Sequence, residues 1–274
     1  MNLPFFKLRL ASHPWILFDR TQGGASEASS TGEPDWGTVA ADMCSRVRGA
    51  SAEGLVVVNK GGGTNLVETW DKTGSPGQPP PAALLCASRW LFDAGMAGSD
   101  SVLMRSRYGE FETSVIDSRN FGISMGKPVG ADCKPLDVPA GSGSFAVSGI
   151  GREGIVVPLI IDGRGIEVTL RDRPVRPGAP SARTRGRSLP HGVDRVEALV
   201  VARHELRTRS GALDPVYSAA AVLAAAGAAD FGDREATVVD GREHLVAQWP
   251  EGESVFVAGA PSYCISGEFW APGS

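Results

Sequence analysis

The side chain best placed to do chemistry in this chain is a carboxylate at the start of an apolar helix. Asp214 lies in LDPVYSAAAVLAAAG, residues 213–227, and a second segment of this kind, PPPAALLCASRWLFDAG, occupies 79–95. A helix that is apolar on every face must be buried, and its first N–H groups have no partner within the helix. Two such helix starts facing one cleft would bind a carboxylate substrate.

The expected carboxylate site consists of backbone N–H groups from both helix starts. Ala82 and Ala83 open the first helix, and Tyr217 and Ser218 open the second, where their side chains could serve only packing and capping. Asp214 has two interpretations. It can act as a helix cap alone, contributing roughly 0.5–2 kcal/mol, or it can also hold a substrate ammonium or iminium group or share in proton transfer.

These helices must be positioned by strands on either side of them. Residues 1–124 are predicted to form one half with a central helix at 82–94, and residues 125–264 a second half with a central helix at 216–226. Residues 265–274 are expected to return to the first half. The repeated order of strands, helix and strands fits an α+β fold of two pseudo-symmetric domains, each a β-sheet wrapped around a central apolar helix.

Shorter elements follow from local patterns. Asp35 is the predicted N-cap of a helix with Val39, Ala40, Met43, Cys44 and Val47 on one face. Residues 5–19 read as two strands joined at Ser12–Pro14, and 59–65 as a hairpin turn. Residues 125–143 are interpreted as a linker, 149–154 as a loop, and the basic stretch 164–187 as a solvated surface loop.

Composition excludes several classes of protein. With 274 residues, 21% charged residues and a net charge of -4, the chain is globular and offers no electrostatic basis for nucleic-acid binding. No apolar run approaches the roughly 18–20 residues of a membrane span, and the N-terminus lacks a secretory signal. We therefore expect a cytoplasmic protein that contacts neither membrane nor nucleic acid; a homodimer is left open.

The sequence predicts neither a metal site nor a disulfide framework. Its four cysteines, Cys44, Cys86, Cys133 and Cys264, are far apart, with no C-x-x-C and no clustered histidines. Cys86 lies two turns inside the first apolar helix and is interpreted as a core residue.

Five segments, in order along the chain, resemble the successive signatures of diaminopimelate epimerase. They are FFKLRLASHPWILFD, RGASAEGLVVV, WDKTGSPGQPPPAALLCASRWL, SRYGEFETSVIDSRNFGISMGKP and VAQWPEGESVFVAGAP. The resemblance covers most of the chain and is weakest over residues 129–187. It implies a cofactor-independent enzyme that moves a proton at a carbon atom.

The departures from that family exclude its own reaction. The family uses a cysteine at the mouth of each central helix, and these positions fall on Pro80 and near Asp214 here. The asparagine of its Gly-Asn-Pro segment, near residues 156–158, is also absent. Since neither proline nor a lone aspartate can replace the thiol pair, epimerisation of diaminopimelate by two thiols is not expected.

The phenazine-pathway isomerase group of the same fold fits better, because LDPVYSAAAVLA resembles its Asp-Pro-Val segment. In that group a glutamate at the first helix-to-strand turn carries the proton, and Glu53 stands at that position. The group's Gly-His-Pro is replaced by Pro80, Pro81 and Ala82, so its histidine is missing. His13 falls where the epimerases place a substrate-binding asparagine, and could instead be an ordinary turn residue.

The proton chemistry expected of Glu53 also follows from its residue type. Shifting a double bond across three atoms removes a proton at one end and delivers one at the other, which a single carboxyl group can do. Glu53 precedes the apolar strand LVVV, where burial would raise its pKa. The alternative is an ordinary turn glutamate.

The sequence therefore predicts an isomerase without a cofactor that shifts a double bond in a small unsaturated carboxylic acid of the pyrroline type. The loss of the thiol pair indicates secondary metabolism rather than lysine synthesis, and the isomerases of 4-alkyl-L-proline formation in antibiotic biosynthesis, which share this fold, fit this profile. Two alternatives remain. One is an amino-acid epimerase or racemase that uses Glu53 and Asp214 in place of thiols, and the other is a carboxylate-binding protein without activity.

Overall fold

The computed structural model describes residues 2–21, 34–61, 63–129, 155–171, 193–209, 213–230, 232–250 and 252–270. The chain divides into two compact units. Unit 1 comprises residues 1–123 and 259–274, and unit 2 comprises residues 124–258. The sequence-based boundaries lie at 124/125 and 264/265, so the return to unit 1 begins six residues earlier in the structure, at Gly259 rather than Ile265.

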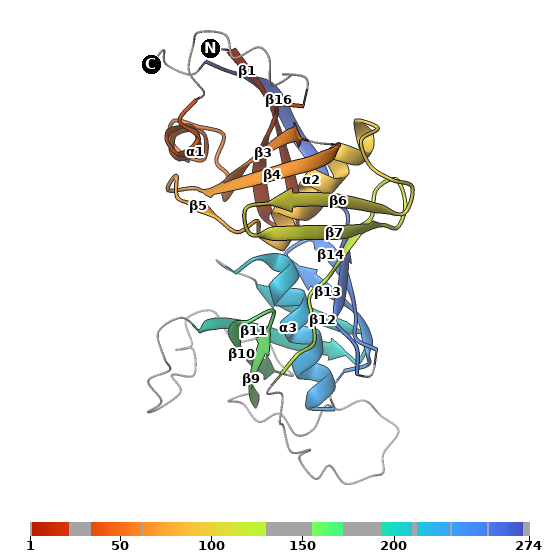
Figure 1. The fold of residues 1–274 in the computed structure, drawn as a ribbon. Helices are drawn as coiled ribbons and strands as arrows, with labels where there is room; N and C mark the ends of the chain where they lie inside the picture. Colours follow the sequence, from red (N-terminus) through yellow and green to blue (C-terminus); the bar gives the residue numbers. More distant parts are fainter. Residues whose placement is uncertain are drawn as a thin grey trace, which may run out of the picture. The chain divides into compact units, whose positions relative to one another are not determined.

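Unit 1 is built on a sheet in which the C-terminal strand lies beside the N-terminal one (Figure 1). The order across the sheet is β16-β1-β2-β3-β4-β6-β7-β8, and β5 pairs with β4. Its strands are β1 (Asn2–Leu10), β2 (His13–Asp19), β3 (Gly54–Gly61), β4 (Thr64–Asp71), β5 (Pro76–Gly77), β6 (Ser101–Ser106), β7 (Gly109–Val115), β8 (Phe121–Ser124) and β16 (Ser262–Trp270). Since β2 begins at His13, the connecting turn is Ala11–Ser12 rather than Ser12–Pro14.

Two helices pack on this sheet. Helix α1 (Trp36–Met43) packs on β3 and β4, and helix α2 (Pro81–Asp93) packs on β1, β2, β3, β6 and β7. Ile16 and Phe18 of β2 join the apolar cluster that includes α1. Because side chains alternate along a strand, the intervening buried residue Leu17 points to the opposite face, towards α2.

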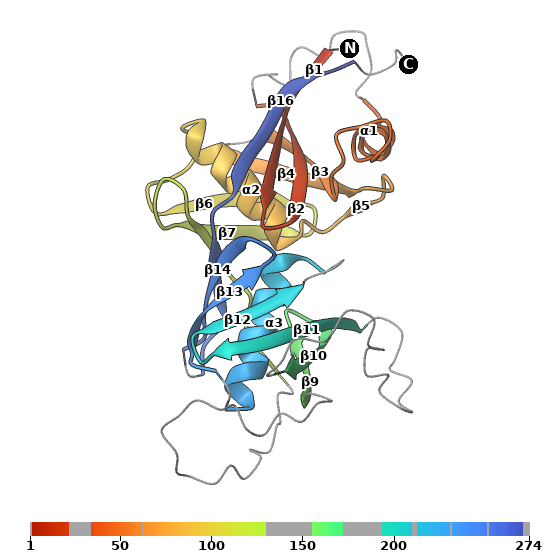
Figure 2. The same cartoon turned by 180° about the vertical axis from the view of Figure 1, so that it is seen from behind.

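Unit 2 surrounds the helix α3 (Pro215–Ala228) with strands (Figure 2). The strand order is β15-β14-β13-β12-β11-β10-β9, and α3 contacts every strand from β9 to β14. The strands are β9 (Ile155–Ile161), β10 (Arg164–Arg171), β11 (Asp194–Ala202), β12 (Glu205–Arg209), β13 (Glu235–Asp240), β14 (Glu243–Gln248) and β15 (Phe256–Gly259). Residues 215–226 of α3 are all buried, and six strands of the sheet contact the helix. The predicted pairing of a sheet with a central apolar helix is therefore present in each unit, and the pseudo-symmetry between the units stays a prediction.

Two local predictions were wrong. Val47 is 93% exposed, because α1 ends at Met43 and the chain then turns away, so Val47 does not share the buried face of that helix. The basic stretch begins not as a loop but as strand β10, whose alternate residues Ile166, Val168 and Leu170 are buried. The remainder of that stretch, most of the predicted linker and the 149–154 loop lie outside the described residues.

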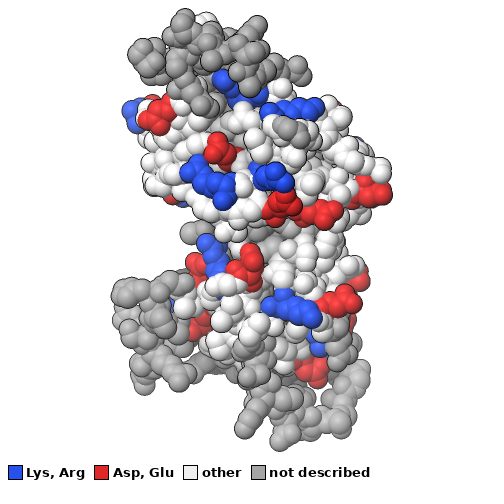
Figure 3. All heavy atoms as spheres, viewed as in Figure 1, with Lys and Arg blue, Asp and Glu red and all other residues white. Residues whose placement is uncertain are grey.

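The described surface mixes the two signs of charge. On the face shown in Figure 3, Lys and Arg side chains stand beside Asp and Glu side chains rather than in a continuous basic stripe. Ion pairs such as Arg107 with Glu68 and Arg195 with Glu167 account for part of this mixing. Among the helices described, none has both the length and the apolar character needed to cross a membrane.

Candidate functional site

Asp214 is the N-cap of α3. Its side chain accepts a hydrogen bond from the N–H of Val216 at 2.9 Å, and Pro215 occupies the first helical position. Proline is well suited there because its missing N–H would have had no helical partner. Asp214 is only 8% exposed, so its carboxylate is a buried cap. The capping role is confirmed, and the additional proton-transfer role stays a prediction.

Tyr217 anchors the same first turn to the β9–β10 hairpin. Its O–H donates to Oδ2 of Asp162 at 2.9 Å, and the guanidinium of Arg164 lies 4.8 Å from the centre of its ring. Burial and the bond to Asp162 raise the pKa of the Tyr217 phenol, so it is protonated at neutral pH. The Tyr217 side chain therefore does more than the packing expected from the sequence.

Ser218 has a buried hydroxyl. Its side chain is fully buried, and Oγ has no hydrogen-bond partner among the residues described. The backbone N–H of Ser218 donates to the carbonyl of Asp214 at 3.0 Å as a helical bond. The N–H of Ser218 is thus already used within the helix, which is a correction to its predicted part in the carboxylate site. Its hydroxyl is the polar group of Ser218 that has no partner among the residues described.

Ala82 and Ala83 lie in the first turn of α2, as predicted, and both are fully buried. Pro80 is the N-cap, and Pro81 occupies the first helical position; the proline at the cap offers no side-chain hydrogen bond. The first intrahelical bond runs from the N–H of Leu84 to the carbonyl of Pro80. The start of α2 therefore differs from that of α3, where an aspartate side chain already binds an N–H group.

His13 and Glu53 lie at the same end of the β2–β3 pair. The N–H of Glu53 donates to the carbonyl of Pro14, the residue after His13, at 2.8 Å. His13 is the first residue of β2 and is 6% exposed, so it is not an exposed turn residue. Alternation along β2 directs its side chain towards α2.

The Glu53 side chain is held by Lys72. Nζ of Lys72 binds Oε2 of Glu53 at 2.8 Å, and the Glu53 side chain is 31% exposed. Glu53 follows the turn after α1 and directly precedes β3, as expected, but the apolar burial predicted for it is absent because the carboxylate lies beside this ammonium group at the surface. The ion pair fixes one carboxylate oxygen, and the other is available to a ligand.

Trp15 was not identified from the sequence. Its indole Nε1 is buried and has no hydrogen-bond partner within the described part of the chain. Trp15 pairs with Gly54, the residue after Glu53, and a Cβ at Gly54 would lie 2.3 Å from the Trp15 ring. Only the pairing of β2 with β3 brings the Trp15 ring against Gly54, so no local signal could have revealed this buried donor. Asp162 also escaped notice, although Asp-Gly between two apolar runs is a hairpin signal.

The described cysteines do not replace the missing thiol pair. Cys44 is buried at the end of α1, and burial, with the charges of Glu53 and Asp71, raises the pKa of its thiol to about 12. Cys86 is buried in α2, as predicted, and Cys264 is exposed on β16. Within the described ranges, no group of three or more His, Cys, Asp or Glu side chains is arranged to hold a metal ion.

The structure resembles solved structures along nearly its whole length. A phenazine biosynthesis protein of the PhzF family from Enterococcus faecalis matches with a TM-score of 0.65 and 13% identity, covering 99% of this chain and 100% of that one. A predicted epimerase from Pseudomonas aeruginosa matches with a TM-score of 0.62 and 14% identity, covering 98% and 100%. A hydroxyproline epimerase from Agrobacterium vitis, with bound trans-4-hydroxy-L-proline, matches with a TM-score of 0.55 and 11% identity, covering 97% and 92%.

The sequence alone finds no such relatives, since no protein-family model and no curated protein matches it. Identities of 13% and 14% establish the architecture and not the reaction. The chain therefore has the fold of the PhzF-family proteins and of hydroxyproline epimerase, as the resemblance in its sequence implied.

Proposed function

We propose that this chain is an isomerase that needs no cofactor and acts by proton transfer on a small carboxylic acid. The observation that carries the proposal is the full-length likeness in fold to proteins described as epimerases and as PhzF-family members. Glu53, at the position of the proton-carrying glutamate of the phenazine-pathway group, supports it. The reaction we favour is the shift of a double bond in a pyrroline-type carboxylate.

Glu53 is the proposed catalytic base and acid. Lys72 holds Oε2, so Oε1 takes a proton from one end of a three-atom unit, and the carboxyl group, after exchange of its proton with solvent, delivers a proton at the other end. The C–H electron pair becomes the new double bond, and the electrons of the old double bond form the new C–H bond. The step is balanced without an oxidant or reductant. General acid–base catalysis of this kind contributes about 10² to 10⁴ in rate.

Each unit contains a buried donor group suited to a carboxylate. In unit 1, Trp15 Nε1 of β2 is a buried donor with no partner among the residues described, and β2 pairs with β3, the strand that Glu53 precedes. In unit 2, the Ser218 hydroxyl lies buried in the first turn of α3. Buried polar groups are nearly always hydrogen-bonded, and a bound carboxylate would supply the acceptor. Asp214 is the proposed second polar group, either holding an ammonium or iminium or sharing the proton.

A five-membered cyclic amino acid is the proposed substrate class. The hydroxyproline epimerase of similar fold holds trans-4-hydroxy-L-proline, which, like a pyrroline carboxylate, is a five-membered nitrogen ring that bears a carboxylate. A double-bond shift in such a ring, within antibiotic biosynthesis that makes a 4-alkyl-L-proline, is the specific role we propose.

The test is hydrogen exchange in D₂O with pyrroline-2-carboxylates that bear an unsaturated side chain. We expect deuterium in the product together with a shifted ultraviolet absorbance, and loss of both in Glu53→Gln. The matched control is Glu68→Gln, which also removes an ion-paired surface glutamate from unit 1 and should leave the rate unchanged. Equal rates in the two variants would remove Glu53 from the reaction.

The second candidate function is an epimerase that uses carboxylates, favoured by the two structural relatives described as epimerases. It predicts deuterium at the α-carbon with no change in absorbance. Binding of the substrate without any hydrogen exchange would indicate a carboxylate-binding protein that has no enzymatic activity. The same experiment therefore separates the three functions.

A further inference from the structure

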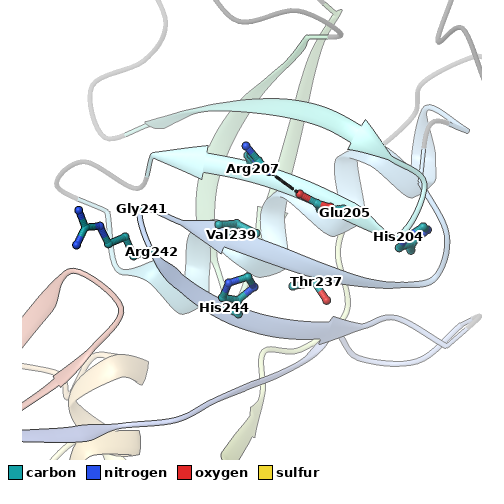
Figure 4. Close-up of a pocket in the computed structure, with 8 residues that line it drawn as sticks. All are labelled: His204, Glu205, Arg207, Thr237, Val239, Gly241, Arg242 and His244. Carbon is teal, nitrogen blue, oxygen red and sulfur yellow. Dashed lines mark hydrogen bonds and ion pairs between the residues drawn. The ribbon is translucent and has the colours of Figure 1, made fainter.

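A concave site lies within unit 2, on the sheet face that points away from α3. Leu206, Val238 and Leu245 are buried beneath the sheet, and alternation turns their neighbours outward. These neighbours form an open hollow of about 460 Å³ (Figure 4). Its lining residues are His204, Glu205, Arg207, Thr237, Val239, Gly241, Arg242 and His244.

The hollow arises because short side chains lie between long ones. Arg207 of β12 pairs with Val239 of β13, which in turn pairs with His244 of β14. The outer two residues are thus separated by two strand spacings, roughly 10 Å. Both side chains are long enough to reach over Val239. Thr237 beside it adds a hydroxyl to the floor.

The lining is rich in cationic and N–H donor groups. The hollow is lined by two arginines, two histidines and a single carboxylate, that of Glu205. Nε and Nη2 of Arg207 both bind Oε1 of Glu205, at 3.1 and 3.0 Å. Glu205 therefore uses two of the five N–H donors of the guanidinium and fixes its orientation, and the remaining donors can serve a ligand.

We propose that this hollow binds a small dianion of the phosphate type, either free or as a phosphate ester. Arg207, oriented by Glu205, donates from one side and His244 from the other. Arg242 and the Thr237 hydroxyl add further donors, and Val239 forms an apolar floor for the rest of an ester. A phosphate group suits this arrangement because its oxygens accept from several directions at once. This site is separate from the helix starts proposed for catalysis.

The experiment is an NMR titration of backbone amides with inorganic phosphate, glycerol phosphate and acetate at constant ionic strength. Saturable shifts centred on Val239 and His244 are expected with both phosphates. Arg207→Gln and His244→Gln should each weaken binding, Arg207→Gln by about tenfold or more because it removes charged hydrogen bonds. Arg195→Gln is the matched control, because Arg195 is also an exposed, glutamate-paired arginine on a strand of this sheet but does not line the hollow.

Each outcome bears on the proposal. Tighter binding of glycerol phosphate than of inorganic phosphate would identify an ester as the ligand, and equal binding would identify the free anion. Three results would overturn the proposal: failure of the shifts to saturate at millimolar phosphate, acetate binding as tight as phosphate, or a loss of phosphate affinity in Arg195→Gln equal to that in Arg207→Gln. Arg207 and His244 are exposed, so both variants should fold, and circular dichroism checks this. The readout does not depend on isomerase activity.

Discussion

Asp214 combines a structural role with a proposed chemical one, and two substitutions can separate these roles. Asp214→Ala removes both the cap and the charge. Asp214→Asn keeps an oxygen that can accept from the N–H of Val216 and removes only the charge. Asparagine and aspartate are comparably good N-caps, so the two variants differ mainly in the buried hydrogen bond.

The expected loss of stability follows from the burial of that bond. Replacing an N-cap aspartate with alanine costs about 0.5–2 kcal/mol, and a buried N–H left without a partner costs about 1–3 kcal/mol. Because Asp214 is only 8% exposed, we expect Asp214→Ala to lower the free energy of unfolding by about 2 kcal/mol. Asp214→Asn loses the interaction of its charge with the helix dipole, about 0.3–1 kcal/mol. At about 2–4 °C per kcal/mol, the midpoint of thermal unfolding should fall by roughly 4–8 °C for Asp214→Ala and by about half that or less for Asp214→Asn.

The assay pairs thermal unfolding with the deuterium-exchange rate. If Asp214 shares the proton work, both variants lose activity by about 10²-fold or more; if it is a cap alone, Asp214→Asn retains activity. Asp35→Ala is the control, since Asp35 caps α1 in the same way at an exposed position and should lose less stability and no activity. The reasoning is refuted if Asp214→Asn destabilises as much as Asp214→Ala.

Three further predictions use other contacts. Gly54→Ala should lower the free energy of unfolding by about 1–3 kcal/mol, because the new Cβ would lie 2.3 Å from the Trp15 ring and 2.5 Å from a backbone oxygen. The control is Gly77→Ala, whose Cβ would have no heavy atom within 4 Å. Urea unfolding should show no change in stability for this control. Tyr217→Phe should lower the free energy of unfolding by about 1.5–3 kcal/mol, because it loses the hydrogen bond to the Asp162 carboxylate. Tyr108→Phe, at an exposed site, is the control in the same urea experiment. At pH 8, iodoacetamide should modify exposed Cys264 and spare buried Cys44, whose pKa of about 12 leaves roughly one part in 10⁴ as thiolate. Peptide mass mapping reads this out, and modification of Cys44 at a rate like that of Cys264 would contradict the burial of its thiol.

The fold was largely readable from local patterns. The two central helices were predicted at 82–94 and 216–226, and lie at Pro81–Asp93 and Pro215–Ala228. Their apolar character on every face, their entry through proline and the aspartate before the second are local properties, which fix helix starts whatever the rest of the chain does. The N-cap Asp35 and the hairpin at 59–65 followed for the same reason.

The environment of each polar side chain could not be predicted in this way. An apolar strand directly after Glu53 suggested burial, yet Lys72, which follows β4, reaches its carboxylate at the surface. His13 was expected in a turn and is buried in β2. The Trp15 ring lies against Gly54 only because β2 and β3 pair in parallel with a long connection between them.

The sequence by itself thus determined which segments are helices, where they start and which of them must be buried, because propensity, capping and apolar pattern act within a few residues of the chain. The tertiary structure decided which charges meet. Tyr217 and Asp162 are 55 residues apart and form one hydrogen bond, and Arg207 and His244 come to flank Val239 only through strand order and register. Electrostatic and hydrogen-bonding environments depend on such long-range neighbours, whose positions the local pattern of residues does not encode.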